Sequence, residues 1–377
     1  MKNIYTHLSV IVFLLLSTGI NTIAQKGKTE TIPLKADNWE FKPGTVEFLK
    51  YDSKPAMKLL SGDDIVVLKD YSFTDGTIEY DMEPLVKGFT SFYFRWKDPG
   101  ESEIFYFRTW AAGDLQAMNA VQYAPTIKGV NLWDLMFHFQ ANATYKNNEW
   151  NHVKLVVSGK QMRAYVNDMS IPVLEVPMLE GITSSGTLAF DGQVAIANLV
   201  VKPGETEGLS PEPGIDPVAN DTRYLRKWQV SDPIITENDI DFRNAYYPGD
   251  SANWQEIAAE RRGLINLTRK FGQINGRRIA WLKTTVHSDK EQNMTLRFGF
   301  SDEVWMLINK KPLYLDKNLY NTPMEKRPGG RCTIDNASIT VPLKEGDNEL
   351  LVGVSNFFYG WGIVARFDDL NGIKISQ

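Results

Sequence analysis

The sequence predicts an all-β protein of two β-sandwich (jelly-roll) domains in tandem, preceded by a signal peptide. Short runs of alternating apolar and polar residues recur along most of the 377 residues, with turn-forming residues between them. A stretch rich in proline and glycine interrupts these runs beyond the middle of the chain. The chain also starts with a positive residue and a short apolar run.

Residues 1–24 have the three parts of a secretory signal peptide. Lys2 is followed by the apolar run Leu8–Leu16, and the small-residue site Thr22–Ala24 precedes Gln25. The run is shorter than the ~20 apolar residues that cross a bilayer. No second long apolar segment follows, so we expect a secreted protein, periplasmic or extracellular, that does not span the membrane.

Composition and charge restrict the classes of partner and cofactor that we expect for this protein. The net charge is −5 and no basic cluster stands out, which argues against a nucleic-acid partner. The single cysteine, Cys332, allows no internal disulfide and is expected to be buried. No zinc-binding spacing occurs, and we predict no cofactor. A structural calcium ion at Asp63–Asp64 or Asp368–Asp369 stays open, beside the alternative of solvated acidic turns.

The proline-rich stretch divides the chain. Residues 28–202 form the first predicted sandwich, and residues 223–377 form the second. Between them, residues 203–222 hold Pro203, Pro211, Pro213 and Pro217, together with several glycines and acids. This composition predicts an exposed, semi-stiff linker.

A hairpin in the first domain carries the most suggestive local pattern. Residues 91–96 and 103–110 alternate in character, and residues 97–102 are turn formers. We expect Phe94 opposite Phe105 and Phe92 opposite Phe107, all four facing the core. Because successive strand residues point to opposite faces, the other face would then carry Tyr93, Arg95, Tyr106 and Arg108.

That face has the chemistry of a sugar platform. Aromatic rings present flat apolar surfaces, and arginine donates a fork of hydrogen bonds. Residues 109–148 are expected to be a long inserted loop with Trp110, Tyr123 and Trp133. The loop either completes a site or packs over the face and fills it. The predicted ligand-binding residues are Tyr93, Arg95, Tyr106, Arg108, Tyr123 and Trp133.

Several segments of the first domain resemble the concanavalin A-like, laminin-G-like sandwiches of lectins and glucanases. They are Phe73–Glu79, Phe92–Arg95, Glu103–Arg108, Trp150–Val157 and Arg163–Asn167. The resemblance implies a jelly-roll sandwich over residues 28–202. Its members include lectins, glycosidases and adhesion modules, so it implies no single activity.

The second domain resembles the galactose-binding-like jelly rolls attached to exported glycosidases. The resemblance rests on Phe298–Asp302, Val304–Asn309, Leu343–Leu351 and the strand reached through Trp361 and Gly362. Such domains often bind sugars at loops on one edge, while others are structural. The aromatic segment Phe357–Trp361 is either an exposed surface or a buried end of the sandwich. Its neighbouring glycines favour burial.

Glu79, Asp81 and Glu83 alternate along one strand, as in the E-x-D-x-E strand of laminarinase- and lichenase-type glycosidases. That resemblance implies a nucleophile, a helper and an acid/base, in that order. A retaining mechanism needs two carboxyls about 5–5.5 Å apart. Tyr80 stands where those enzymes have an aliphatic residue, and Pro84 follows at once. The alternative is a solvent-facing strand whose acids pair with Arg95 or Arg108.

These observations predict an exported carbohydrate-binding protein, non-catalytic or accessory to glycan use, with a glycan as its partner. One alternative is a glycoside hydrolase that uses Glu79, Asp81 and Glu83. A second alternative is a surface adhesion or structural module. An open groove lined by the acids and arginines would favour a ligand site, whereas a groove filled by residues 109–148 would favour a structural role.

Overall fold

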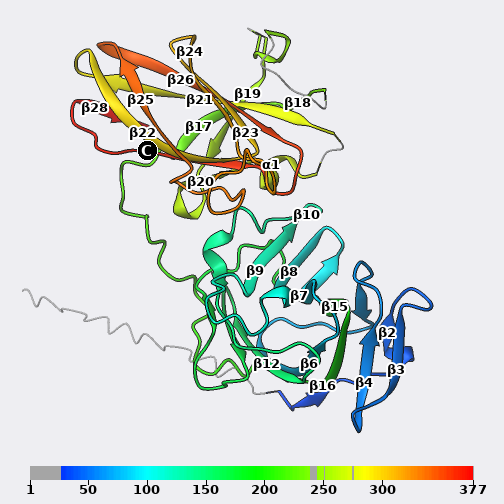
Figure 1. The fold of residues 1–377 in the computed structure, drawn as a ribbon. Helices are drawn as coiled ribbons and strands as arrows, with labels where there is room; N and C mark the ends of the chain where they lie inside the picture. Colours follow the sequence, from blue (N-terminus) through cyan, green and yellow to red (C-terminus); the bar gives the residue numbers. More distant parts are fainter. Residues whose placement is uncertain (1–26, 238–243, 250, 274–275, 377) are drawn as a thin grey trace, which may run out of the picture.

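The computed structural model describes residues 27–237, 244–249, 251–273 and 276–376. It shows two antiparallel β-sandwiches, the first at the bottom of Figure 1 and the second at the top. The prediction of an all-β fold with sandwich domains is confirmed. The predicted signal peptide, residues 1–24, lies outside the described residues. No helix in the described ranges has the length and apolar character needed to cross a membrane.

One sheet of the first domain, the β6 sheet, has eight strands in the order β14-β13-β12-β6-β16-β4-β3, with β1 beside β16. Its strands are β1 (Glu30–Thr31), β3 (Val46–Tyr51), β4 (Lys54–Leu59), β6 (Gly76–Pro84), β12 (Asn151–Ser158), β13 (Gln161–Val166), β14 (Leu174–Val176) and β16 (Val194–Pro203).

The facing sheet, the β7 sheet, has the order β10-β9-β8-β7-β15-β5-β2, with β11 beside β9. Its strands are β2 (Trp39–Glu40), β5 (Val66–Leu68), β7 (Phe89–Asp98), β8 (Glu101–Arg108), β9 (Val121–Ile127), β10 (Val130–Asn131), β11 (Gln140–Ala141) and β15 (Thr187–Gly192). Three short 3-10 helices, η1 (Ala36–Asn38), η2 (Thr109–Ala111) and η3 (Phe137–Phe139), lie in the loops.

The core lies between the two sheets and follows the alternation of the strands. Ile78, Tyr80 and Met82 of β6 face Phe92 and other rings of the β7 sheet. The ring centroids of Tyr80 and Phe92 are 5.1 Å apart. Burial of large apolar side chains of this kind is the main stabilising contribution to such a sandwich.

The β7–β8 hairpin forms as predicted, but its register differs. Phe92 lies opposite Phe105, whereas Phe94 lies opposite Glu103. The register shifts again between Phe94 and Asp98, where β7 holds extra residues, and the strands continue to Asp98 and Glu101. The predicted pairs Phe94–Phe105 and Phe92–Phe107 were therefore wrong, because a β-bulge changes which residues face each other.

Residues 109–148 do not form a loop that covers the sheet. They contain β9, β10 and β11, and β9 pairs with β8 along its whole length. The segment therefore extends the β7 sheet sideways, and Trp133 from it packs against the outer face.

The second domain also consists of two sheets. The β26 sheet has the order β19-β17-β21-β26-β23-β24, with β18 and β28 also beside β21, and the β22 sheet has the order β20-β27-β22-β25. The strands are β17 (Lys227–Ser231), β18 (Ile234–Ile235), β19 (Trp254–Ala258), β20 (Leu264–Asn266), β21 (Arg278–Ser288), β22 (Gln292–Ser301), β23 (Glu303–Ile308), β24 (Lys311–Lys317), β25 (Ala337–Leu343), β26 (Gly346–Asn356), β27 (Gly362–Phe367) and β28 (Ile373–Ile375). The helical pieces are η4 (Asn244–Tyr246), η5 (Arg261–Gly263) and α1 (Leu267–Phe271).

The proline-rich segment between the domains lies against the first domain. Leu209 is buried with Val156 and Tyr165. The backbone N–H of Lys160 donates to the carbonyl of Pro211, and that of Gly214 donates to the carbonyl of Pro177. The other residues of 203–222 are exposed or half-buried, so the segment contacts the first domain while most of it stays exposed.

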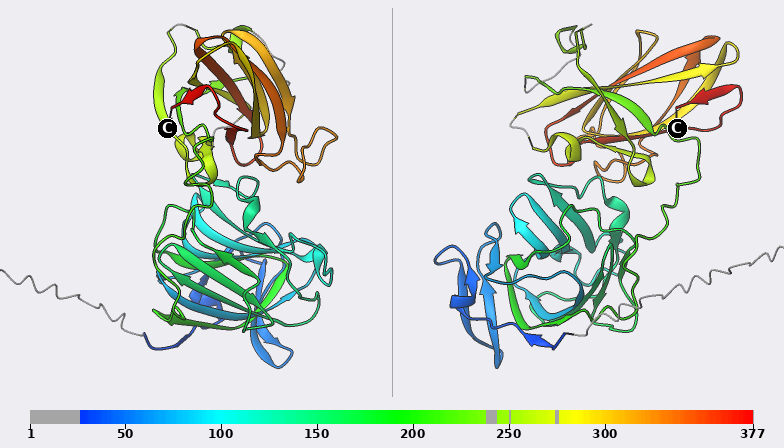
Figure 2. Two further views of the ribbon diagram at one scale, coloured as in Figure 1. Left: turned by 90° about the vertical axis from the view of Figure 1, so that its left-hand side faces the viewer. Right: turned by 180° about the vertical axis from the view of Figure 1, so that it is seen from behind.

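The two domains also meet directly, as both views in Figure 2 show. Leu135 and Met136 of the first domain belong to the same buried cluster as Leu264, Cys332 and Val364 of the second. Cys332 is buried there, as predicted. Because apolar and polar contacts cross between the domains, their surfaces can contribute to one site.

Candidate functional site

A cleft of about 590 Å³ lies on the outer face of the β7 sheet, on the side turned away from the core. Four of the predicted ligand-binding residues line it, namely Tyr93, Tyr106, Arg108 and Trp133. We call this cleft the first cleft. Its floor comes from β7, β8, β9 and β15, and part of its wall comes from the second domain.

One row of polar side chains crosses the floor. Gln122 of β9 lies opposite Tyr106 of β8, which lies opposite Ser91 of β7, which in turn lies opposite Asp191 of β15. Neighbouring strands are about 4.8 Å apart. Gln122 is fully buried, whereas Tyr106, Ser91 and Asp191 line the cleft. The row therefore presents hydrogen-bonding groups to the cleft over roughly 10 Å, which is two such spacings.

The next row is largely apolar. Ala124, Ile104, Tyr93 and Ala189 lie opposite one another in sequence across the same four strands. These side chains form one buried cluster with Trp96. A polar row beside an apolar row suits a ligand with both hydroxyl groups and apolar faces.

Arg108, Tyr106 and Gln122 form a hydrogen-bonded network at one end of the polar row. The Arg108 Nη2 donates to Gln122 Oε1 at 2.6 Å and to the Tyr106 hydroxyl at 3.1 Å. The Tyr106 hydroxyl donates to Gln122 Oε1 at 2.6 Å. Burial raises the pKa of Tyr106 to about 12, so its hydroxyl stays a neutral donor. The partners of the Arg108 guanidinium in this network are therefore neutral groups.

Asp191 marks the other end of the row. The Tyr93 hydroxyl donates to Asp191 Oδ2 at 2.6 Å. Burial raises the pKa of Asp191, although hydrogen bonds from Tyr93 and Ser91 oppose the shift. Asp63 also lines the cleft at this side. Sequence reasoning missed Asp191, Ser91 and Gln122, because each stands alone in its strand without a recognisable motif.

Aromatic residues of the second domain form a wall of the cleft, namely Tyr320, Phe358 and Tyr359. The Trp133 ring meets the Tyr320 ring edge-on at 4.9 Å and the Tyr359 ring at 5.9 Å. The Arg331 guanidinium lies 5.1 Å from the centroid of the Trp133 ring. Trp133 therefore joins the β7 sheet to the second domain, which no local pattern in the sequence indicated.

Two exposed rings stand at the rim. Phe89 lines the cleft and is 53% exposed, and Trp110 beside it is 46% exposed. Their ring centroids are 4.7 Å apart in an edge-on arrangement. Exposed aromatic surface of this kind marks interaction sites more often than isolated apolar residues do.

Arg95 lies elsewhere than predicted. Its φ of +50° places it in the β-bulge, so Trp96 instead joins the outer face. The Arg95 side chain donates to the carbonyl of Thr74, and its Nη2 donates to Asp75 Oδ1 at 2.9 Å. The prediction that Arg95 shares a face with Tyr93 was therefore wrong.

Tyr123 points into the core. Its hydroxyl donates to Glu103 Oε2 at 2.6 Å and accepts from the backbone N–H of Glu180 at 2.6 Å. Burial raises the pKa of Glu103 to about 7, although the Tyr123 hydrogen bond opposes the shift. Tyr123 therefore lies behind the floor of the first cleft and does not line it.

The three acids of the predicted catalytic strand lie on the other sheet. Lys202 Nζ lies 2.7 Å from Glu79 Oε1, and Lys54 Nζ lies 2.9 Å from Asp81 Oδ2. His152 stands between these two acids, with Nδ1 2.8 Å from Asp81. Glu83 accepts from the Tyr51 hydroxyl at 2.9 Å. The acids therefore do not line the first cleft, and their partners are not Arg95 or Arg108 as expected.

The aromatic segment Phe357–Trp361 is divided between surface and interior. Phe357 and Tyr359 are each 47% exposed, whereas Trp361 is fully buried. The Asp302 carboxyl group anchors the turn, because its Oδ2 accepts from the backbone N–H groups of Phe357 and Phe358. A Cβ on Gly360 would collide with Asp134, so the expectation of close backbone approach is correct here.

The acidic turns considered for calcium have other contacts. Asp63 lines the first cleft. Asp368 Oδ1 lies 2.8 Å from Arg297 Nε. Within the described ranges, no three His, Cys, Asp or Glu side chains lie together in a way that could hold a metal ion.

No family model matches the sequence, and no curated protein matches it. Several solved structures align with about half of the chain. They include the carbohydrate-binding module CBM66 from Bacillus subtilis, at 17% identity over 44% of this chain and 92% of that chain, with a TM-score of 0.30. The β-glucanase of Bacillus licheniformis aligns at 14% identity over 48% of this chain and 99% of that chain, with a TM-score of 0.32. The galectin LEC-6 of Caenorhabditis elegans aligns at 15% identity over 45% of this chain and 99% of that chain, with a TM-score of 0.28.

Proposed function

We propose that this protein is an exported carbohydrate-binding protein whose glycan occupies the first cleft. One observation carries the proposal. Aromatic rings and fixed hydrogen-bonding groups converge on a single cleft, with Tyr106, Arg108 and Asp191 on its floor and Tyr359 on its wall. Sugars offer apolar ring faces to aromatic side chains and hydroxyls to polar ones, so this combination fits them.

The polar groups are held in place before a ligand arrives. Arg108 is buried and already bonded to Gln122 and Tyr106, and Asp191 is bonded to Tyr93. Side chains that are already ordered lose less entropy on binding. The arrangement supports recognition of a particular pattern of hydroxyls.

The role in capture, without hydrolysis, is part of the proposal. The acids Glu79, Asp81 and Glu83 stand on the β6 sheet and are bound to lysine, histidine and tyrosine partners. A hydrolase that used them would have to hold its substrate away from the aromatic cleft.

The test is a panel of polysaccharides measured by affinity electrophoresis and calorimetry with the mature chain. The variants are Phe89→Ala and Tyr359→Ala, each of which removes an exposed ring that lines the first cleft. Each should weaken binding roughly three- to ten-fold, the value of one aromatic contact. Leu315→Ala is the control, because Leu315 is 56% exposed on β24, away from the first cleft.

The proposal fails if the folded protein binds no polysaccharide of a broad panel, or if all three variants bind as the wild type does. Export is tested separately. Expression with the native N-terminus should place the protein outside the cytoplasm, and N-terminal sequencing should find Gln25 first. A cytoplasmic protein that begins at Met1 would contradict that part.

A further inference from the structure

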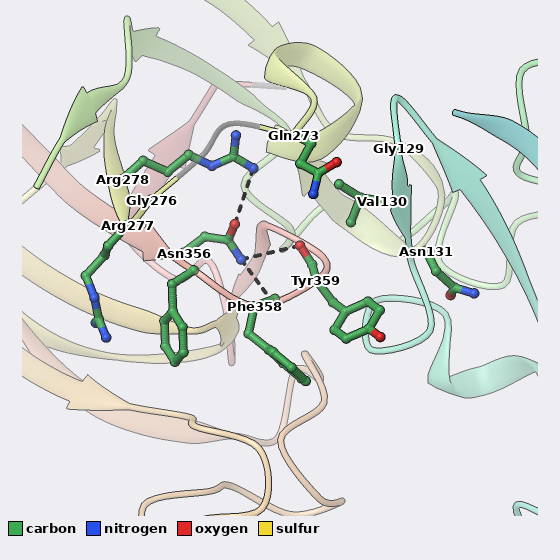
Figure 3. Close-up of a pocket in the computed structure, with 11 residues that line it drawn as sticks. Gly129, Val130, Asn131, Gln273, Gly276, Arg277, Arg278, Asn356, Phe358 and Tyr359 are labelled. Carbon is green, nitrogen blue, oxygen red and sulfur yellow. Dashed lines mark hydrogen bonds between the residues drawn. The ribbon is translucent and has the colours of Figure 1, made fainter. Parts of the chain in front are cut away.

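A second cleft, of about 740 Å³, lies where the two domains meet (Figure 3). The first domain supplies Gly129 from the turn between β9 and β10, and Asn131 from β10. The second domain supplies Arg277, Arg278 and Asn356, together with Gln273 and the aromatic residues 357–359. Figure 3 shows Arg278 and Gln273 at the upper side of the cleft and Asn131, from the other domain, at its right-hand edge.

The second cleft adjoins the first. Four residues line both of them: Gly129, Asn131, Phe358 and Tyr359. The exposed Tyr359 ring therefore stands at the junction of the two clefts. A chain of several sugar units that lies in the first cleft can continue past this ring into the second.

The second cleft is cationic. Among the described residues, its lining includes Arg277 and Arg278 but no Asp or Glu. Arg278 donates from Nη1 to the carbonyl of Gly272 at 2.6 Å and from Nη2 to Asn356 Oδ1 at 3.2 Å. Both acceptors are neutral, so neither of these bonds cancels its charge.

The carboxyl groups nearby leave this positive charge in excess. Asp302 is the acid whose charge would attract the Arg278 guanidinium. Burial raises the pKa of Asp302 to about 8, so Asp302 is mostly neutral at pH 7. Arg277 Nη1 lies 2.6 Å from Glu303 Oε2, but the same carboxylate also lies 3.2 Å from Lys317 Nζ. Two cations therefore share one carboxylate.

The first cleft also carries a positive charge whose hydrogen-bond partners are neutral, on the side of the second domain. Arg108 is held by Gln122, Tyr106 and the carbonyl of Asn119, which are all neutral acceptors. Among the described residues, two acids line that cleft, and Asp191 lies at the other end of the polar row, with Asp63 on the same side. Asp191 lies two strands away from Tyr106, which is roughly 10 Å.

We propose that the second cleft binds the carboxylate of an acidic sugar unit, so that the ligand of this protein is a polysaccharide containing uronic acids. Guanidinium groups and amides are the donors that recognise carboxylates, and the aromatic rings of Phe357 and Tyr359 offer surface to the sugar ring. The inference rests on the proposed binding of glycans in the first cleft and names their chemical class.

The experiment compares matched ligands with the full mature chain. Homogalacturonan, alginate and hyaluronan are each measured against their methyl-esterified or carboxyl-reduced forms. The acidic form of the bound polysaccharide should bind at least about ten-fold more tightly, because charge-assisted hydrogen bonds are lost with the carboxylate. The difference should shrink between low and high salt, since salt screens the attraction. A sulfated polysaccharide serves as a further arm and should not match the carboxylated one.

The variant Arg277→Gln should reduce the preference for the acidic form and leave binding of the neutral form unchanged. Arg297→Gln is the matched control, because Arg297 also pairs with one carboxylate but lies outside both clefts. Thermal melting checks that each variant folds, and if Arg277→Gln does not fold, the wild-type comparison of matched ligands still decides.

The outcomes separate the two proposals. Equal binding of acidic and neutral forms, or tighter binding of the neutral form, overturns this inference and leaves the proposed function standing. A preference that Arg277→Gln retains in full also overturns it, because the charge then acts elsewhere. Absence of binding to every form overturns the proposed function as well.

Discussion

Asp134 of the first domain and Ser301 of the second meet inside the protein, with Asp134 Oδ2 3.1 Å from the Ser301 hydroxyl. Asp134 Oδ1 also accepts from the backbone N–H of Gly360 at 3.1 Å. Ser301 in turn lies 3.2 Å from Asp302 Oδ1. The loop that carries Tyr359 is thereby fixed to the first domain by buried polar contacts.

These contacts make the stability of the protein depend on pH. Burial raises the pKa of Asp134 to about 7 and that of Asp302 to about 8, each from 3.8. In the folded protein both carboxyls favour the neutral form. Their contribution to the stability of the fold is therefore fully present below about pH 4 and is lost as the pH rises through 7 to 8. The side chain of the Asp134→Asn variant cannot ionise. Between pH 5.5 and pH 9, the melting temperature of this variant should therefore fall less than that of the wild type.

The expected gain of Asp134→Asn over the wild type at pH 9 is on the order of a few kcal/mol. Glu103 and Glu180 have pKa values raised to about 7 by burial, so the variant should keep part of the pH dependence. Asp369→Asn, in an exposed turn, is the control and should melt in parallel with the wild type. Parallel curves for Asp134→Asn would refute this account.

The hydroxyl of Tyr123 is expected to support the core without contacting the ligand. Tyr123→Phe removes the bond to the buried Glu103 and should lower the free energy of unfolding by about 1–3 kcal/mol. Tyr71→Phe is the control, because it breaks a similar bond to Glu30 at the surface. Denaturation in urea measures both, and glycan affinity of Tyr123→Phe should equal that of the wild type.

Asp81 is expected to act in stability alone. Burial opposes its ionisation, but hydrogen bonds from His152, Lys54 and Asn198 outweigh burial and lower its pKa to about 2. The contribution is therefore present above about pH 4 and is lost as the pH falls towards 2. Asp81→Asn should cost about 1–3 kcal/mol at pH 7 and less at pH 3.5, measured by urea denaturation.

The control for Asp81 is Glu175→Gln, which breaks the exposed pair with Arg163. That change should cost below about 1 kcal/mol. Glycan binding by Asp81→Asn should be unchanged, since Asp81 lies on the β6 sheet. A loss of binding without a loss of stability would show that the wrong sheet has been assigned to the ligand.

Gly159 tests the contact between the proline-rich segment and the first domain. Its φ is +50°, and a Cβ there would collide with the carbonyl of Pro211. Gly44 also has a positive φ, +83°, but a Cβ there would meet no atom within 4 Å. Both Ala substitutions carry a backbone cost of about 1–2 kcal/mol, and only Gly159→Ala should also expose residues 203–222 to limited proteolysis. Equal cleavage of the two variants would mean that this contact does not hold the segment.

The sequence predicted the sandwiches and the hairpin because alternation along each strand reports directly which side chains are buried. It placed Tyr93, Tyr106 and Arg108 on one face for the same reason. Arg95 was misplaced because one extra residue in a strand reverses the faces beyond it, and alternation alone does not reveal where that residue sits.

Other parts of the candidate site follow from contacts between distant segments. Residues 109–148 were expected to be a loop, so Tyr123 was not recognised as a core-facing residue of β9. Tyr320 and Tyr359 reach the first cleft from the second domain, and their positions depend on how two folded domains meet. Local patterns contain no information on that arrangement, although the aromatic segment Phe357–Trp361 was noticeable by composition.

Tyr320 and Tyr359 form part of the wall of the first cleft, so the cleft is completed late during synthesis of the chain. The loop that carries Tyr359 follows β26, which ends at Asn356, and precedes β27, which ends at Phe367. The first domain leaves the ribosome long before these strands exist. The complete cleft thus forms only after nearly the whole chain has been made, and a ligand added during refolding would report the late docking of the domains.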